Sequence, residues 1–391
     1  MQNFVFHNPT KILFGRDTLS SLGNETRQLG GRALLVFGKN SIHKTRLYDK
    51  VAASLRLSGL TVVDHGGVQS NPLLSHVRKG IATVKQNNLD VIVAVGGGSV
   101  IDSAKAIAAG SMVEHDVWKF FIGKKSIKAA LPVVTVLTLA AAGSEMNSGM
   151  VITNEQTREK FGFGHRLLYP AVSILDPELT FTVPPDYTAY GAVDAIAHVL
   201  EFYMTTRDPD TPVQDSLMEG LIKNSINACE RCLADPCDYH GRANLMWTAT
   251  LALNGLISAG LGRVGFPMHM IEHSLSALYN VPHGAGLAVV IPGWLTWFRQ
   301  HNEARIAALG RNIFPPSDLQ PYSDTQIAER TIKILKNWFS KIQCPVTLEE
   351  LEIPTRDIPG IAENALAMAR IWRMNNYSQK TIEDILHLCN F

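Results

Sequence analysis

The chain has 391 residues, of which 46% are apolar and 18% charged, so it can bury a sizeable core and is not a disordered chain. Its 36 lysines and arginines balance 35 aspartates and glutamates, which leaves no electrostatic footprint for nucleic acid or an anionic membrane. The longest apolar run, residues 129–143, is too short for a transmembrane helix, and residues 1–15 lack the apolar run of a signal peptide. The pair Cys229 and Cys232 lacks the second pair that a zinc site needs, so we expect reduced thiols. A cytoplasmic protein is the expectation that follows.

Short apolar runs alternate with helical patterns in the first half of the chain. The runs predict buried strands at residues 33–37, 60–64, 90–95, 131–137 and 172–175. Amphipathic patterns between and after them predict helices at residues 73–87, 100–110, 218–233, 243–256 and 325–342. Strands rich in Val, Ile and Leu that alternate with helices are typical of a mostly parallel sheet covered on both faces. Because the strand runs stop near residue 180, we predict an α/β domain over residues 1–180 and a helical domain over residues 181–391.

A glycine-rich turn follows the third of these strands. Gly96, Gly97 and Gly98 turn the chain, and we expect Ser99 to cap the helix that starts there. Glycines let a phosphate approach the backbone, and the free N–H groups of a helix start favour an anion. The pattern is neither G-x-G-x-x-G nor a P-loop, so a tight turn without a ligand is the alternative. A second turn rich in small residues, 138–145, also follows a strand and supports nucleotide binding.

The end of the first strand bears on which nicotinamide nucleotide the chain prefers. An acid at this position hydrogen-bonds the ribose 2′-OH of NAD and repels a 2′-phosphate. The chain has Gly38 and Lys39 there, and no acid until Asp49. This permits a 2′-phosphate and mildly favours NADP; alternatively, Lys39 is a solvated loop lysine.

Histidines cluster in the second half of the chain. His269, His273 and His283 fall within fifteen residues, and His269 and His273 share a helix face, as do Asp194 and His198. Imidazole and carboxylate are the usual ligands of zinc, iron and similar divalent metals. Two helices and a following loop can therefore supply one aspartate and three histidine ligands.

One rival interpretation uses part of the same cluster. Residues 269–273 match H-x-x-E-H, the pattern of inverted zinc peptidases, with Glu272 as the base between His269 and His273. It explains neither Asp194 and His198 nor the glycine turn, so it accounts for less of the chain.

Several motifs carry a family resemblance over nearly the whole chain. They are Asn8–Gly15, Asn71–Pro72, Gly96–Ser99 with Asp102, Gly143–Glu145, Leu175–Pro177, Asp194–His198 and Phe266–Pro292. Together they resemble the iron-containing (group III) alcohol dehydrogenases, in particular the NADP-dependent butanol dehydrogenase and broad-specificity aldehyde reductase branch. The resemblance implies a Rossmann-like α/β N-terminal domain and an all-α C-terminal domain, in a dehydroquinate-synthase-like architecture.

The resemblance also implies residue roles. It makes Asp194, His198, His269 and His283 the four metal ligands, and His273 a histidine beside the nicotinamide and the substrate. It makes Gly97, Gly98 and Ser99 the pyrophosphate cradle. The other residues that it implicates in the nucleotide and substrate site are Gly38, Lys39, Asn40 and Ser41 at the adenosine ribose, then Asn71, Asp102, Thr138, Asn147 and Lys160. Many relatives have Thr where this chain has Ala142, which puts one cofactor contact in doubt.

The implied reaction is the reversible reduction of an aldehyde by NADPH to a primary alcohol. The enzyme is expected to use NADP(H) in preference to NAD(H), with one divalent metal, Fe²⁺ or Zn²⁺. Its expected partners are a small aldehyde or alcohol substrate and a second copy of the chain in a homodimer. His273 either relays a proton or only packs in the pocket. The alternatives of the same fold are a glycerol or diol dehydrogenase and a dehydroquinate-synthase-like lyase. The apolar neighbours of the ligands, such as Ile196 and Met268, favour a small neutral aldehyde over an anionic lyase substrate.

Overall fold

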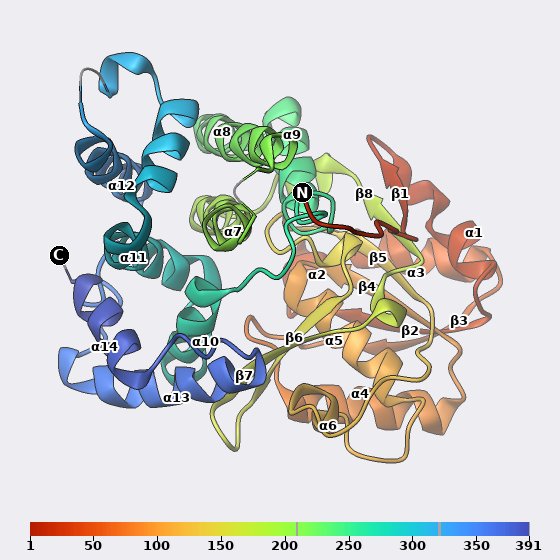
Figure 1. Ribbon diagram of the computed structural model, residues 1–391. Coiled ribbons are helices and arrows are strands. Elements are labelled where there is room, and N and C mark those ends of the chain that lie inside the picture. The colour runs from red at the N-terminus through yellow and green to blue at the C-terminus, as the bar shows by residue number, and fades with distance from the viewer. Residues whose placement is uncertain (209, 320–321, 391) are drawn as a thin grey trace. The chain divides into compact units, whose positions relative to one another are not determined.

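The structure of the protein is a computed structural model that describes residues 1–208, 210–319 and 322–390 (Figure 1). The chain forms two compact units. The sheet unit contains His7–Val183 and Asp235–Asn254, and the helical unit contains Met1–Phe6, Pro184–Ala234 and Gly255–Phe391. The polypeptide thus leaves the sheet unit after Val183 and returns to it once, which a single boundary at residue 180 does not describe.

A parallel sheet forms the centre of the sheet unit. Among the described residues it has six strands in the order β1-β8-β5-β4-β2-β3, each parallel to its neighbours. The strands are β1 (Lys11–Phe14), β2 (Arg32–Phe37), β3 (Thr61–His65), β4 (Val91–Gly96), β5 (Val133–Leu137) and β8 (Val172–Leu175). A separate antiparallel hairpin consists of β6 (Gly149–Asn154) and β7 (Glu159–Gly164). The sequence analysis predicted the bounds of β2, β3, β4, β5 and β8 to within two residues, but it did not predict β1 or the hairpin.

Helices cover both faces of the sheet, as near-continuous apolar strands require. Leu35, Val93 and Val136 point to one face, where they pack with Leu22 of α1 and Val51 of α3. The opposite face of β4 packs on α5, which is buried from Val100 to Gly110. The helices of this unit are α1 (Leu22–Arg27), α2 (Ser41–Lys44), α3 (Leu47–Leu57), α4 (Leu74–Asn87), α5 (Gly98–Gly110), α6 (Trp118–Phe121) and α9 (Tyr239–Ala252). Short 3₁₀ turns are η1 (Thr18–Ser21), η2 (Ser144–Met146), η3 (Arg166–Leu168) and η4 (Pro177–Thr180).

The strand order reverses between β2 and β4. From β2 the chain proceeds outward to β3, whereas from β4 it proceeds the other way to β5 and β8. Phe37 lies opposite Val95, so Gly38 and Gly96 follow at the same carboxyl edge. Ligands of open parallel sheets bind at such a reversal, where the two outgoing loops leave a crevice. The two predicted nucleotide turns therefore start from the two strands that flank the reversal.

The helical unit is built around α11, which packs against α7, α10, α12 and α14. Its helices are α7 (Pro185–Thr205), α8 (Pro212–Ala234), α10 (Pro267–Tyr279), α11 (His283–Ile313), α12 (Asp324–Lys341), α13 (Ile358–Ile371) and α14 (Gln379–Leu388), with 3₁₀ turns η5 (Pro316–Asp318) and η6 (Thr355–Asp357). Proline stands in the first turn of α7 and α10, where its missing N–H costs no hydrogen bond. Within the described residues, no helix is both long and apolar enough to cross a membrane.

Candidate functional site

The predicted metal ligands come from three helices of the helical unit. α7 carries Asp194 and His198 one turn apart on a face that is buried throughout. α10 contributes His269, and His283 is the first residue of α11. Asp194, His198 and His269 are each at most 5% exposed. The fold thus brings together four side chains that span ninety residues of sequence.

The distances from Asp194 to the three histidines match those in a tetrahedral site. Nδ1 of His198 lies 3.6 Å from Oδ1 of Asp194, Nε2 of His269 lies 3.5 Å from it, and Nε2 of His283 lies 3.6 Å from it. A tetrahedral metal with ligands at 2.0–2.2 Å separates neighbouring ligand atoms by about 3.4 Å. The three distances are therefore those that one shared metal would impose.

The hydrogen bonding of the cluster also fits a cation. Oδ1 of Asp194, Nδ1 of His198 and Nε2 of His269 are buried and have no hydrogen-bond partner among the described residues. Buried polar atoms are nearly always paired, so three unpaired atoms that converge on one point indicate a ligand. Three imidazoles and a carboxylate suit Zn²⁺ or Fe²⁺ in type and number.

Electrostatics at the cluster point the same way. Burial alone would raise the pKa of Asp194, but His198 and the other imidazoles hold it below its usual range. Burial lowers the pKa of His198 to about 3, so its ring is neutral and offers a lone pair at pH 7. Burial would also lower the pKa of His269, but Asp194 and Glu201 raise it to about 9. The carboxylates thus make this cluster attractive to positive charge.

Two glutamates orient two of the histidines. Oε1 of Glu201 accepts hydrogen bonds from the His269 backbone N–H at 2.9 Å and from its Nδ1 at 3.1 Å. The carboxylate of Glu272 contacts Nδ1 of His283 and accepts from the hydroxyl of Ser276. Both glutamates are fully buried. A carboxylate on Nδ1 fixes the tautomer that leaves Nε2 free to ligate, which is the usual arrangement around a metal-bound histidine.

The sequence analysis missed both of these roles. Glu201 follows His198 by three residues and Asp194 by seven on α7, so helical spacing alone places it on the ligand face. Glu272 was considered only as the base of a peptidase. Because its carboxylate is occupied by His283 and Ser276, it is not placed to activate water between His269 and His273.

His273 lies beside the metal cluster, within reach of Glu272 and His283 rather than of Asp194. Its ring centroid is 5.6 Å from that of His283 and 5.7 Å from that of Trp372, and the side chain is 4% exposed. This position matches a residue next to the metal rather than one of its four predicted ligands.

The predicted pyrophosphate turn joins β4 to α5 in the sheet unit. Gly97 is the N-cap and α5 begins at Gly98, so Ser99 lies in the first turn and the prediction that it caps the helix was wrong. The backbone amides of Gly98 and Ser99 are thus among the free N–H groups of the helix start. A Cβ at Gly98 would lie 2.9 Å from that of Ala142, so the second small-residue turn packs directly on the first. Thr138, the residue after β5, donates its N–H to the carbonyl of Gly96 at the end of β4, at 3.1 Å.

The adenosine end of the predicted site is open. Gly38 follows β2, Lys39 and Asn40 are exposed, and Ser41 begins α2. A Cβ at Gly38 would meet only the carbonyl of Val68, at 3.8 Å. The structure leaves space at this position on the β2 side of the strand reversal.

The hairpin brings two further predicted residues together. Nζ of Lys160, on β7, donates to Oδ1 of Asn71 at 2.9 Å, and both side chains are buried. Thr153, opposite Lys160 on β6, donates its N–H to the carbonyl of Pro72 at 2.8 Å. Asn71 and Lys160 are therefore held at a fixed place by the hairpin.

Comparison with known proteins decides the family. The family model for iron-containing alcohol dehydrogenases matches residues 9–177, and the model for the C-terminal part of the same family matches residues 188–390. The chain belongs to the iron-containing alcohol dehydrogenase family. The resemblance found in the sequence and the expected fold, a mostly parallel sheet followed by a helical domain, are thereby confirmed. Membership of this family gives no support to the peptidase alternative.

Individual relatives cover nearly all of the chain. It is 41% identical over 386 residues, 99% of each protein, to probable NADH-dependent butanol dehydrogenase 1 of Bacillus subtilis. It is 34% identical over 364 residues, 92% of each protein, to the NADPH-dependent aldehyde reductase YqhD of Escherichia coli. The crystal structure of NADH-dependent butanol dehydrogenase A from Thermotoga maritima superposes with a TM-score of 0.94 at 40% identity, covering 100% of this chain and 99% of the other.

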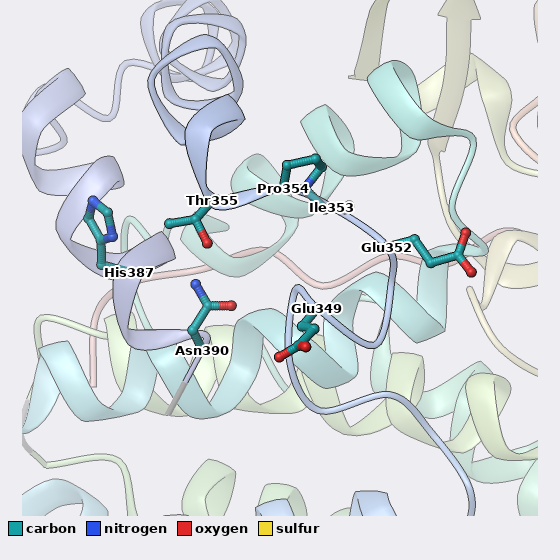
Figure 2. A pocket seen from close by; sticks show the side chains of 7 residues that line it. All are labelled: Glu349, Glu352, Ile353, Pro354, Thr355, His387 and Asn390. Carbon is teal, nitrogen blue, oxygen red and sulfur yellow. The ribbon is translucent and has the colours of Figure 1, made fainter.

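A surface pocket in the helical unit shares no lining residue with the metal cluster. Glu349, Glu352 and Ile353 line it with Pro354 and Thr355, and His387 and Asn390 close it from the end of α14 (Figure 2). In this view the carboxylates of Glu349 and Glu352 point in different directions. They do not converge as ligands would, and no predicted site residue lines this pocket.

Proposed function

We propose that this member of the iron-containing alcohol dehydrogenase family interconverts aldehydes and primary alcohols with a nicotinamide nucleotide and one divalent metal, with NADP(H) favoured. The observation that carries the proposal is the cluster of Asp194, His198, His269 and His283, whose spacing fits a tetrahedral metal. The glycine turn at the strand reversal supports the nucleotide.

The proposed chemistry needs a metal and a nicotinamide nucleotide. A bound Fe²⁺ or Zn²⁺ acts as a Lewis acid on the substrate oxygen, and a bound NADPH supplies the hydride. Asp194 and the three ligand histidines hold the metal with a net charge near +1, while Glu201 and Glu272 fix two of the imidazoles. Asp194, His198 and His269 are buried, which keeps water away from their ligand atoms and strengthens their electrostatic effect, whereas the His283 side chain is 26% exposed.

On the nucleotide side, the start of α5 provides amides for the pyrophosphate, from Gly98 and Ser99. Asn71 and Lys160 are paired with each other and are proposed to contact the nicotinamide side. Asn147, at the end of η2, is proposed to line the substrate pocket. His273 is proposed to pass a proton between the substrate oxygen and solvent.

The preference for NADP(H) is supported by the adenosine end of the site. Gly38 leaves space for a 2′-phosphate and Lys39 provides a nearby positive charge. Relatives of this chain are named NADH-dependent in B. subtilis and T. maritima and NADPH-dependent in E. coli, so both nucleotides occur among them. The absence of an acid between Gly38 and Asp49 is what favours NADPH here.

We also propose a homodimer. β1 pairs with β8 on one side and is the edge strand of the sheet as far as the described residues show. Phe14 at its end is 40% exposed. An edge strand with free backbone groups is a natural surface for a second copy of the chain. Light scattering on the purified protein measures this directly.

The test of the function is an absorbance assay with butyraldehyde and either NADPH or NADH. It is run before chelation, after chelation, and after Fe²⁺ or Zn²⁺ is returned. We expect NADPH consumption that chelation abolishes and one of the metals restores, with a higher kcat/KM for NADPH than for NADH. 1,3-Propanediol and glycerol, assayed with NADP⁺ and NAD⁺, test the diol alternative. No consumption with any metal, nucleotide or substrate would refute the proposal.

A further inference from the structure

A fully buried lysine lies in the middle of the sheet unit and takes no part in the function proposed above. Lys105 is on α5 and has no solvent exposure. A buried ammonium needs acceptors for its three hydrogens. Nζ of Lys105 donates to Oγ of Ser144 at 2.9 Å, to the carbonyl of Asn147 at 2.9 Å and to the carbonyl of Gly149 at 2.8 Å, with Oδ1 of Asn147 at 3.2 Å.

All of these acceptors belong to one turn, residues 144–149, which we call the tethered turn. It begins after Gly143, at a positive φ of 59°, and runs into strand β6. Asp102, one turn earlier on α5, holds the same segment from a second side. Its Oδ1 accepts from Oγ of Ser144 at 2.6 Å, and its Oδ2 accepts from the N–H of Val151, two residues past the turn in β6, at 2.9 Å. The Lys105 ammonium and the Asp102 carboxylate therefore clamp the tethered turn onto α5.

The tethered turn connects residues that the proposed function places at the substrate and at the nucleotide. It contains Asn147, and the β6 strand that follows it pairs with β7, which carries Lys160. Lys160 in turn contacts Asn71. At the other end of α5, Gly98 packs on Ala142, just before the turn. A shift of the tethered turn would therefore move the predicted nicotinamide-side contacts relative to the pyrophosphate amides.

We propose that the protonated side chain of Lys105 is a positioning group that holds the tethered turn in the nucleotide-binding conformation, so that loss of its proton weakens nucleotide binding. The inference rests on the proposed nicotinamide-dependent function. Lys105 itself is too buried to touch the nucleotide, so it acts through Asn147 and the hairpin.

The charges around Lys105 make its proton removable in an accessible pH range. Burial lowers the pKa of Lys105 to about 8, although Asp102 on α5 and Glu145 on η2 both favour the charged form. Lys160 on β7 belongs to the same network because its charge stabilises the Asp102 carboxylate. A neutral amine has one hydrogen fewer to donate and no charge to attract the three oxygens of the turn. Nucleotide affinity is therefore expected to fall as pH rises through about 8.

The experiment measures the dissociation constants of NADPH and NADH by nucleotide fluorescence, without aldehyde, on the full-length protein from pH 6.5 to 9.5. Lys105→Met removes the charge with a side chain of similar length. Lys79→Met, at an exposed position on α4, is the matched control. We expect Lys105→Met to bind both nucleotides about 10- to 100-fold more weakly at pH 7, with no change between pH 7 and 9.5. The wild type and Lys79→Met should lose affinity above pH 8, and metal content should be unchanged in every variant.

Ser144→Ala gives a second test that does not depend on the stability of Lys105→Met. It removes one acceptor of the ammonium and one donor to Asp102, so the fall in affinity should begin at a lower pH than in the wild type. If Lys105 had a purely structural role, Ser144→Ala would change the nucleotide affinity at every pH but not the pH at which the affinity begins to fall. A wild-type profile without a break, or Lys105→Met with wild-type affinity, would overturn the inference. A wild type that binds neither nucleotide would overturn the proposed function instead.

Discussion

Glu201 offers the sharpest test of the metal cluster because it can be changed without removing a ligand. Its Oε1 accepts two hydrogen bonds from His269, one from the backbone and one from Nδ1. In Glu201→Gln the amide oxygen can still accept both, so the position of His269 is kept while the negative charge is lost. The variant therefore isolates the electrostatic contribution of the carboxylate to the metal.

The expected effect follows from the strength of the two bonds. A hydrogen bond to a charged group contributes about 1.5–3 kcal/mol and a neutral one about 0.5–1.5 kcal/mol, so the substitution weakens the support of His269 by roughly 1–3 kcal/mol. Carboxylates that hold ligand histidines typically change metal affinity by about 10- to 100-fold when they are replaced, which is the same range. The new amide group would replace Oε2, an atom with no hydrogen-bond partner in the described part of the chain, at a further cost to stability of about 1–3 kcal/mol.

The assay is a competition titration in which a chelating dye and the protein share Zn²⁺ or Fe²⁺. We expect the Glu201→Gln protein to bind metal about 10- to 100-fold more weakly than the wild type. Glu230→Gln is the control, because Glu230 accepts hydrogen bonds from Trp338 and Lys341 and contacts no predicted ligand. If Glu201→Gln binds metal as tightly as the control, the carboxylate does not support the ligand and the reasoning fails.

Three further predictions concern other parts of the structure. His273→Ala should keep its metal but lose turnover and change its pH–rate profile, since His273 lies outside the predicted ligand set; a full metal content with an unchanged profile would reduce it to a packing role. Gly143→Ala should lower the free energy of unfolding by about 1–3 kcal/mol in denaturant, because φ is +59° and the new Cβ would lie 2.9 Å from the carbonyl of Ala249. Burial lowers the pKa of His65 to about 4, so the unfolded chain binds more protons between pH 4 and 6.5, and stability should fall over that interval as pH is lowered; the fall should be smaller in His65→Phe, measured by thermal unfolding.

Local sequence patterns predicted the parts of the fold that depend on local physics. Apart from Arg32 and Ser173, the strands β2, β4 and β8 are apolar, and every residue but Arg32 is buried, which is the pattern of a strand covered on both faces. β1 was missed because it has only four residues at the edge of the sheet, with Lys11 and Phe14 exposed and Ile12 and Leu13 half-buried. The β6–β7 hairpin was missed because Lys160 and the glycines of β7 interrupt an apolar pattern. The segment 235–254 reads as an ordinary helix, and nothing local shows that α9 packs in the sheet unit.

The predicted ligands could be found because helical spacing joins Asp194 to His198 and because His269 and His283 lie in one histidine cluster, but their supporting residues could not. Glu201 lies on the ligand face of α7, but charged residues also occupy the solvent face of a helix, so the spacing alone does not assign it a role. Lys105 sits in a sequence of small apolar residues that gives no hint of its partners, which lie about forty residues away in the tethered turn. Such contacts are set by how α5 packs against β6, and packing between distant segments leaves no periodic trace.

The H-x-x-E-H pattern shows why spacing alone does not assign chemistry. On a helix, His269, Glu272 and His273 all lie within one turn, so the same letters suit a peptidase or a dehydrogenase. The difference lies in what each carboxylate faces. In this structure Glu272 contacts His283, which belongs to a different helix. The carboxylate next to Nε2 of His269 is that of Asp194, a predicted ligand, and not that of a base for water. A catalytic base must have a carboxylate free to take a proton, whereas a supporting carboxylate must be engaged by the ligand that it holds. The contacts of Glu272 are of the second kind, so they favour a role in holding the predicted ligand His283 over a role as a base.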